Sequence, residues 1–246
     1  MAGSRAFLTA EWRYLLMLNY EVDPAVLAPL VPAGVELDIW NGKALVSMVG
    51  FLFLNPRVMG LPIPFHRNFD EVNLRFYVRR VVNGELQRGV VFVKEIVPKP
   101  WIARIARWLY GEKYVALPMS HTLERDHQGN LRPEALVEYT WKYRRRRQRL
   151  GGLVQGEPAL PQPGSEEEFI TEHYWGFTSR GTGKTGAYQV EHPTWRVWQV
   201  AQPYFLCDVE ALYGKAFEPF LYHPPRSAFL AEGSPIQVNW GKPFKV

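Results

Sequence analysis

Several charged and polar residues lie within apolar segments of this sequence, where they could hold a polar small molecule. In "DEVNLRFYVRR", residues 70–80, polar side chains alternate with apolar ones, and the polar set is Glu71, Asn73, Arg75 and Tyr77. Lys94 and Glu95 interrupt "GVVFVKEIV", and Arg13 begins the first apolar strand, "WRYLLMLNYEV". Burial of an unpaired charge is costly, so such groups require a partner or a ligand. An arginine with one or two carboxylates and surrounding aromatics suits a polar ligand site.

The position of these residues decides between two interpretations. If the sheet closes into a barrel, the polar face of residues 70–80 points into the lumen and forms a ligand site. The competing interpretation, which the sequence supports equally, is a set of buried structural ion pairs.

A second concentration of polar and aromatic residues lies in "EHYWGFTS" and "VEHPTWRVW", each with a Glu-His dipeptide near a tryptophan. Pro193 favours an extended backbone at His192 and so restricts where that ring points. We count Tyr174, Trp175, Glu191 and His192 as candidate ligand-binding residues. An aromatic core whose histidines make local hydrogen bonds is the somewhat favoured alternative.

Other chemistries lack the residues they need. "RGTGKTG" (180–186) ends like a phosphate-binding loop, but Thr178 stands where the first glycine belongs, and the following residues favour a strand over a helix. We expect a glycine-rich hairpin tip. The six histidines show no zinc-binding spacing, and Cys207 is the only cysteine, so we expect no metal, cofactor or intramolecular disulfide. No GxSxG nucleophile motif is present.

The net charge of +5 comes largely from one run, "KYRRRRQR" (142–149), without which the chain is nearly balanced. We interpret this run as a solvated strand end, with anion binding second, and expect no nucleic-acid partner. The longest apolar run, residues 44–54, is too short to cross a membrane as a helix, and residues 1–20 make a poor signal peptide. We expect a cytoplasmic protein without a membrane partner.

Short β-type segments dominate the elements that must position these residues. Hairpins are predicted at Asn41-Gly42 and Asn83-Gly84, since both residue pairs tolerate the positive φ of tight turns. Residues 101–111 have the apolar stripe of a helix, and 150–168 form a Gly/Pro-rich surface excursion. The fold class is mainly β (α+β), and one domain over residues 1–246 is expected.

The run "EWRYLLMLNYEVDPAVLAPLVPAGVELDIWNGKALVSMVGFLF", with "FHRNFDEVNLRFYVRR", "KEIVPK" and "VEHPTW", resembles the bacterial YqjF-like family, an uncharacterised group. The motifs occur in order over most of the chain. This family is related in fold to acetoacetate decarboxylase. The resemblance implies a closed, barrel-like antiparallel or mixed sheet with an internal pocket and a few peripheral helices.

Acetoacetate decarboxylases form a Schiff base between a lysine and a keto acid, and an adjacent lysine lowers the pKa of that amine. The resemblance places Arg13 on the active-site arginine and Glu71 on one glutamate, while the second glutamate falls near Val49. Lys99 follows Pro98 as in the decarboxylases, but Pro100 replaces the second lysine. Without that cation, an exposed Lys99 keeps its ordinary pKa of about 10.4 and is a poor nucleophile.

These residues suggest three functions. The first is binding of a small organic acid or other anionic metabolite, with Arg13 on the carboxylate. The second is a Schiff-base enzyme of the decarboxylase or lyase type that uses Lys99 or, second, Lys94. The third is an interaction protein that uses residues 142–149, and a homo-oligomer is compatible with all three. The candidate ligand-binding residues are Arg13, His66, Glu71, Arg75, Lys94, Glu95, Tyr174, Trp175, Glu191 and His192.

Overall fold

Strands occupy most of the chain, as the alternating sequence predicts. The computed structural model describes residues 6–62, 68–100, 113–241 and 243–245. The strands are β1 (Ala6–Val22), β2 (Glu36–Leu37), β3 (Ala44–Val58), β4 (Leu61–Pro62), β5 (Asn68–Val82), β6 (Glu85–Val97), β7 (Tyr114–Ala116), β8 (Met119–Leu123), β9 (Leu136–Tyr143), β10 (Arg146–Ala159), β11 (Trp175–Ser179), β12 (Lys184–Glu191), β13 (Val197–Leu206), β14 (Ser227–Asn239) and β15 (Phe244–Lys245). The α-helices described are α1 (Pro24–Leu27), α3 (Glu166–Thr171), α4 (Val209–Tyr213) and α5 (Glu218–Leu221).

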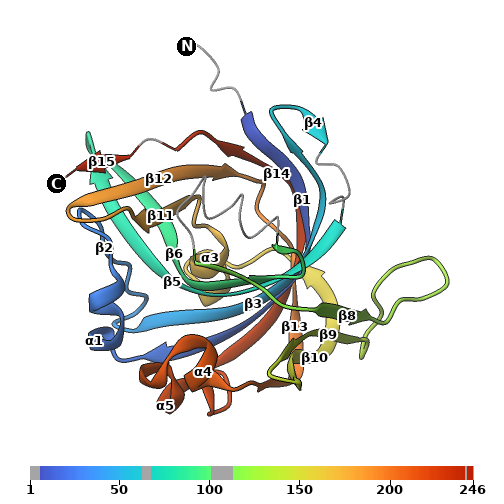
Figure 1. Ribbon diagram of the computed structural model, residues 1–246. Helices are drawn as coiled ribbons and strands as arrows, with labels where there is room; N and C mark the ends of the chain where they lie inside the picture. The colour runs from blue at the N-terminus through green and yellow to red at the C-terminus, as the bar shows by residue number, and fades with distance from the viewer. Residues whose placement is uncertain (1–5, 63–67, 101–112, 242, 246) are drawn as a thin grey trace.

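Strand pairing closes the sheet into a ring, which confirms the predicted barrel-like architecture. In the described part of the chain the ring runs β14, β1, β3, β5, β6, β11 and β12, and β12 then pairs with β14 again. The β6–β11 pairing is parallel, whereas the other pairings around the ring are antiparallel. Helix α3 lies within the ring, while α1, α4 and α5 lie outside it (Figure 1).

Strand β14 divides between two partners and so produces two hydrophobic cores. Val238 pairs with β12 and closes the ring, whereas Ala231 pairs with β13, which begins a second sheet of β13, β10, β9 and β8. The inner core lies within the ring and includes Phe169 of α3. The outer core lies between the ring and the second sheet, where an added Cβ at Gly50 would come within 2.6 Å of Tyr139. We call the side of the ring that contacts the inner core its inner face, and the side that contacts the outer core its outer face.

A β-bulge in β1 reverses which residues face inward. Tyr14 has a φ of 55°, and the β1–β3 register shifts between Arg13 and Leu16. Before the bulge Trp12 contacts the inner core, and after it Leu15 does. Both Arg13 and Tyr14 therefore lie on the outer face, because Arg13 pairs with Leu52 of the outer core and Tyr14 packs against that core.

The predicted turns are confirmed, with one correction to their pairing. Asn83-Gly84 joins β5 to β6, and the glycine-rich tip of residues 180–183 joins β11 to β12. Asn41-Gly42 also forms a tight turn, with Trp40 bridged to Lys43. The prediction that residues before Asn41 pair with β3 is wrong, since β2 pairs with β5.

The predicted surface excursion at 150–168 is wrong for its first ten residues, which belong to β10. Leu150 is fully buried in the outer core. An added Cβ would come within 2.3 Å of Tyr204 at Gly151 and within 2.4 Å of Val200 at Gly152. These glycines permit close strand packing and do not mark a loop. The predicted helix at 101–111 lies outside the described residues.

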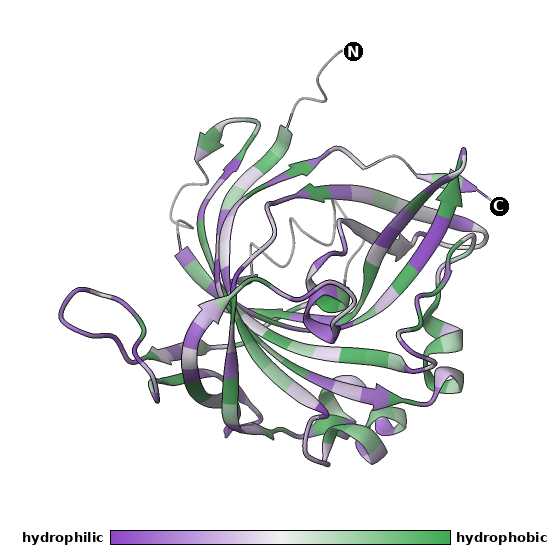
Figure 2. Ribbon diagram, turned by 180° about the vertical axis from the view of Figure 1, so that it is seen from behind, coloured by the Kyte–Doolittle hydropathy of each residue, from purple (hydrophilic) through white to green (hydrophobic). Residues whose placement is uncertain are grey.

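The distribution of hydrophobic and hydrophilic residues matches the arrangement of strands and loops. Hydrophobic residues concentrate along the strands, whereas the loop between β8 and β9, which extends from the body, is mainly hydrophilic (Figure 2). Among the described residues, no helix has the length and apolar character that a membrane span requires.

Candidate functional site

Two buried carboxyl groups meet on the inner face of β5 and β6. Glu71 pairs with Phe51 of the inner core, and Asn73 pairs with Glu95. The Asn73 Nδ2 donates to Glu71 Oε1 at 3.3 Å, and the Tyr114 hydroxyl is hydrogen-bonded to both Glu71 and Glu95. The predicted polar face of residues 70–80 therefore does point into the ring.

Burial controls the protonation of this pair. Glu71 and Glu95 are 3% and 2% exposed. Burial raises the pKa of Glu71 to about 7, although the hydrogen bonds from Asn73 and Tyr114 act in the opposite direction. Burial and the two carboxylates raise the pKa of Tyr114 well above its usual value. Near neutral pH the Glu71 carboxyl thus exists in both forms and can exchange a proton.

Arg75 is a buried cation on the same face of β5, two residues beyond Asn73. It is 9% exposed, and its Nη2 donates to Ile170 O of α3 at 3.4 Å and contacts Met17 Sδ at 3.7 Å. Its Nε has no hydrogen-bond partner, and no acid among the described residues forms an ion pair with it. A buried guanidinium in this state is able to pair with an anion.

His173, which follows α3, faces the same region. Its Nε2 lies 3.1 Å from Asp38 Oδ2, which also accepts from Arg88 Nε at 2.7 Å. Burial lowers the pKa of His173 to about 4, with Arg88 and Arg75 adding to this effect and Asp38 opposing it. Burial would raise the pKa of Asp38, but the hydrogen bonds from His173 and Arg88 outweigh burial and lower it. The imidazole is therefore neutral and donates through Nε2 to the Asp38 carboxylate.

His192 approaches Arg75 from the segment after β12. Its Nδ1 donates to Pro193 O at 2.9 Å, and its ring stacks on Trp195 with centroids 4.0 Å apart. Burial lowers the pKa of His192, as does Arg75, while Pro193 and Glu172 oppose this change. The ring of Tyr174 lies 4.7 Å from that of His192. Of the second predicted group, the structure thus brings Tyr174 and His192 together.

Trp175 and Glu191, also predicted in this group, lie elsewhere. Trp175 packs against the outer core and below the Arg80 guanidinium, 5.9 Å from its ring centroid. Glu191 is exposed and accepts from Asn239 Nδ2 at 2.5 Å. Neither side chain joins the inner face.

The structure does not bring Arg13 to the Glu71 cluster, which corrects the expectation that the two groups share the interior. The bulge at Tyr14 turns Arg13 to the outer face, where its Nη2 lies 3.0 Å from Glu11 Oε2. Its Nη1 donates to Gly233 O at 3.2 Å. The guanidinium that shares the inner face of β5 with Glu71 is that of Arg75.

The lysines also separate from the acidic pair. Lys94 pairs with Leu74 and so lies on the outer face, where burial and the charge of Lys113 lower its pKa. Lys99 is half-buried beyond the end of β6. His66 lies outside the described residues.

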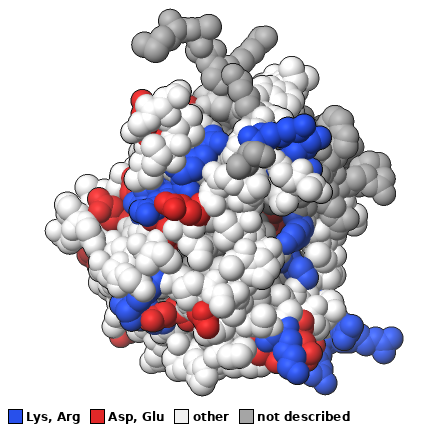
Figure 3. Space-filling model, turned by 90° about the vertical axis from the view of Figure 1, so that its left-hand side faces the viewer, with Lys and Arg blue, Asp and Glu red and all other residues white. Residues whose placement is uncertain are grey.

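The basic run at 142–149 forms the solvated hairpin end that the sequence indicated. Arg144 and Arg145 make the turn with φ values of 47° and 66°. Arg147 and Arg149 reach Glu138 at 3.5 and 3.7 Å. On the face shown in Figure 3, some basic side chains lie beside acidic ones and others lie apart from them.

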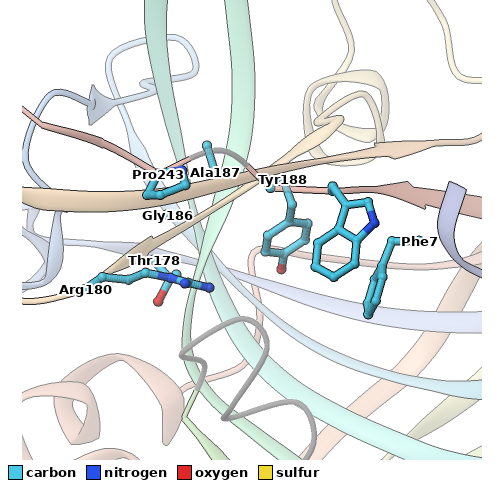
Figure 4. Close-up of a pocket in the computed structure, with 9 residues that line it drawn as sticks. Phe7, Thr178, Arg180, Gly186, Ala187, Tyr188 and Pro243 are labelled. Carbon is cyan, nitrogen blue, oxygen red and sulfur yellow. The ribbon is translucent and has the colours of Figure 1, made fainter. Parts of the chain in front are cut away.

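A cleft opens where β11 and β12 approach the two chain ends. Arg180, Thr178 and Tyr188 supply its polar groups, and Phe7 with Trp240 supplies an apolar wall (Figure 4). Tyr188 is near enough to Tyr114 to raise its pKa. One lining residue of the cleft, Tyr188, is therefore near the tyrosine that bridges Glu71 and Glu95.

The presence of His173 and Asp38 beside the inner face could not be predicted from the spacing of residues in the sequence. The only signal was the Glu172-His173 dipeptide near a tryptophan, and nothing marked Asp38, which is 135 residues away in sequence. Tyr114 likewise carried no signal. Among the described residues, no three His, Cys, Asp or Glu side chains are grouped to hold a metal ion.

Comparison with known sequences gives the family. The profile of DUF2071, described as an uncharacterized conserved protein, matches residues 9–235. The chain belongs to the DUF2071 family. This DUF2071 protein is 46% identical to the uncharacterized protein YqjF of Bacillus subtilis (strain 168) over 68 residues, which are 27% of this chain and 28% of YqjF. The resemblance inferred from the motifs is confirmed.

Several solved structures are similar in fold to this DUF2071 protein, and two of them are described as an acetoacetate decarboxylase or a protein like it. An acetoacetate decarboxylase-like enzyme from Sphingomonas wittichii RW1 is similar with a TM-score of 0.66 and 16% identity, covering 97% of this chain and 92% of that one. Acetoacetate decarboxylase from Legionella pneumophila has a TM-score of 0.67 and 13% identity, covering 96% and 86%. The enduracididine biosynthesis enzyme MppR, solved with pyruvate, has a TM-score of 0.66 and 12% identity, covering 96% and 89%. At these identities the likenesses establish the fold alone.

Proposed function

We propose that this DUF2071 protein binds a small organic acid inside the ring of strands, with Arg75 as the partner of the carboxylate. The observation that carries the proposal is a guanidinium that is 9% exposed and has no acidic partner among the described residues. A carboxylate would supply the counter-charge and accept from Nε. Glu71, His173 and His192 would line the remainder of the site.

The fold supports this proposal through one neighbour of known ligand. MppR was solved with pyruvate, a small keto acid, and its fold is similar over nearly the whole chain. The guanidinium of this DUF2071 protein would come from β5, since Arg13 of β1 faces outward.

Arg75→Gln is expected to remove acid binding without unfolding the protein. Loss of charge-assisted hydrogen bonds should weaken binding by about 100-fold, corresponding to about 3 kcal/mol. Acetate, propionate, lactate and pyruvate are titrated calorimetrically into the full chain. Because the buried cation lacks a partner, its removal should not lower the unfolding temperature of the free protein.

Arg13→Gln is the matched control, since it removes an arginine from the outer face of the same ring. It should bind the acids as the wild type does. Equal losses in both variants, or no binding of any acid by the wild type, would refute the proposed site.

A Schiff-base reaction with a keto acid is the second candidate, because two of the similar structures are described as an acetoacetate decarboxylase and a decarboxylase-like enzyme. Lys94 lies on the outer face, so Lys99 is the remaining predicted nucleophile. Borohydride reduction with pyruvate, followed by peptide mass spectrometry, tests it. A reduced adduct on Lys99 would support this candidate, and an unlabelled protein would dismiss it.

A further inference from the structure

The unpaired polar atoms around Arg75 specify more than a negative charge, although the ligand they describe depends on the proposed function. Buried atoms on this side of the ring that have no hydrogen-bond partner include Trp12 Nε1, Asn73 Oδ1, Arg75 Nε and His173 Nδ1. Buried polar atoms are nearly always paired, so a group of orphans marks where a ligand or water completes the bonding. Whether each unpaired atom is a donor or an acceptor then indicates which group the ligand must present to it.

His173 presents a hydrogen-bond acceptor. Its Nε2 is held 3.1 Å from Asp38 Oδ2, and Asp38 also accepts from Arg88, which keeps the carboxylate ionised. An ionised carboxylate requires a donor, so the proton lies on Nε2 and Nδ1 carries a lone pair. That nitrogen is buried and unpaired.

His173 and Arg75 both lie near the ring of Tyr77, and Arg75 is close enough to His173 to lower its pKa. The ring of Tyr77 contacts both groups, with the Arg75 guanidinium carbon 5.8 Å and the His173 centroid 4.7 Å from its own centroid. The bond from Arg75 to Ile170 O fixes the guanidinium against the helix that precedes His173. His192 repeats the arrangement, because Pro193 O occupies its Nδ1 donor and leaves Nε2 as an acceptor.

We infer that the interior selects a small hydroxycarboxylic acid over the corresponding keto acid, with the carboxylate on Arg75 and the hydroxyl donating to His173 Nδ1. A keto oxygen can only accept, so it would leave the Nδ1 lone pair unpaired and facing another lone pair. A simple carboxylic acid such as propionate would also leave that nitrogen unpaired. An amino acid would offer a donor but would place a second cation near Arg75.

The test compares lactate, pyruvate, propionate and alanine by calorimetry on the full chain. Wild type is expected to bind lactate about 10-fold more tightly than pyruvate or propionate, the cost of one buried unpaired acceptor. His173→Phe keeps an aromatic ring but has no acceptor in place of Nδ1, and Arg88 still donates to Asp38. This variant should bind lactate and propionate equally, with its propionate affinity close to that of wild type.

The other outcomes distinguish a failure of the hydroxyl preference from a failure of the proposed function. Equal binding of lactate, pyruvate and propionate by wild type would overturn the hydroxyl preference and leave acid binding intact. Tighter binding of pyruvate or alanine than of lactate would also overturn it. No binding of any of the four would refute the proposed function itself. If His173→Phe does not fold, the wild-type ratio of lactate to pyruvate still decides the inference.

Discussion

Gly233→Ala is expected to lower the free energy of unfolding by about 3 kcal/mol, the sum of a strained backbone and a steric clash. Gly233 has a φ of 79°, which disfavours any residue with a Cβ. An added Cβ would lie 2.0 Å from Trp12 O and 2.9 Å from Arg13 Cα. Both are backbone atoms of β1, so relief requires β1 and β14 to separate at the bulge. Chemical denaturation measures the loss.

Gly42→Ala is the matched control for this prediction. Gly42 also has a φ of 79°, but an added Cβ there would meet nothing within 4 Å. It should therefore cost about 1 kcal/mol, the backbone term alone. Equal losses in the two variants would show that β1 and β14 tolerate a side chain at the bulge.

The same bulge explains why the inward direction of Glu71 and Arg75 was predicted correctly and that of Arg13 was not. Glu71 and Arg75 follow strict alternation within β5, and no bulge in β5 itself disturbs it. Arg13 precedes a bulge whose positive-φ residue is Tyr14, a residue type that gives no sign of it. The informative glycine, Gly233, lies on the partner strand 220 residues later. Pairing must be known before such a signal can be interpreted.

Elementary strand geometry alone shows that Lys94 and Glu95 cannot both face the interior. Lys94 and Glu95 are consecutive residues of one strand, so their side chains leave opposite faces of the sheet. Only one of them could face the interior, and the structure places Glu95 there. Local patterns thus predicted the strands, most turns and the polar face of β5. The partnership of Asp38 with His173 depends on chain topology, so no local pattern contains it.

Glu71→Gln is expected to abolish a loss of stability that wild type shows as pH rises. Burial raises the pKa of Glu71 from 4.5 to about 7 in the folded protein. The native state therefore binds more protons than the unfolded state between these values, and stability falls as pH increases. The stability that the protonated carboxyl contributes is fully present below pH 4.5 and is lost as pH rises through 7. Integrated over this window, the loss is about 3 kcal/mol.

Urea denaturation between pH 4.5 and 8 gives the comparison. Glutamine keeps the oxygen that Asn73 and Tyr114 contact but cannot ionise, so Glu71→Gln should match wild type at the acidic end and exceed it at pH 8. Glu36→Gln is the control, because the Glu36 carboxylate is exposed and pairs with Arg79 at 2.9 Å on the surface. It should change stability by less than about 1 kcal/mol at every pH.

The protonation of Glu71 also determines whether Arg75 can attract an acid. When Glu71 is neutral, it does not offset the positive charge of Arg75 on the same face of β5. A carboxylate ligand then supplies the counter-charge. With Glu71 ionised, an internal anion opposes that ligand, so acid binding should weaken as pH rises above about 7. Parallel stability curves for wild type and Glu71→Gln would mean that Glu71 remains ionised within the ring. Arg75 would then already be compensated from within the protein, and the reason for it to bind an external carboxylate would disappear.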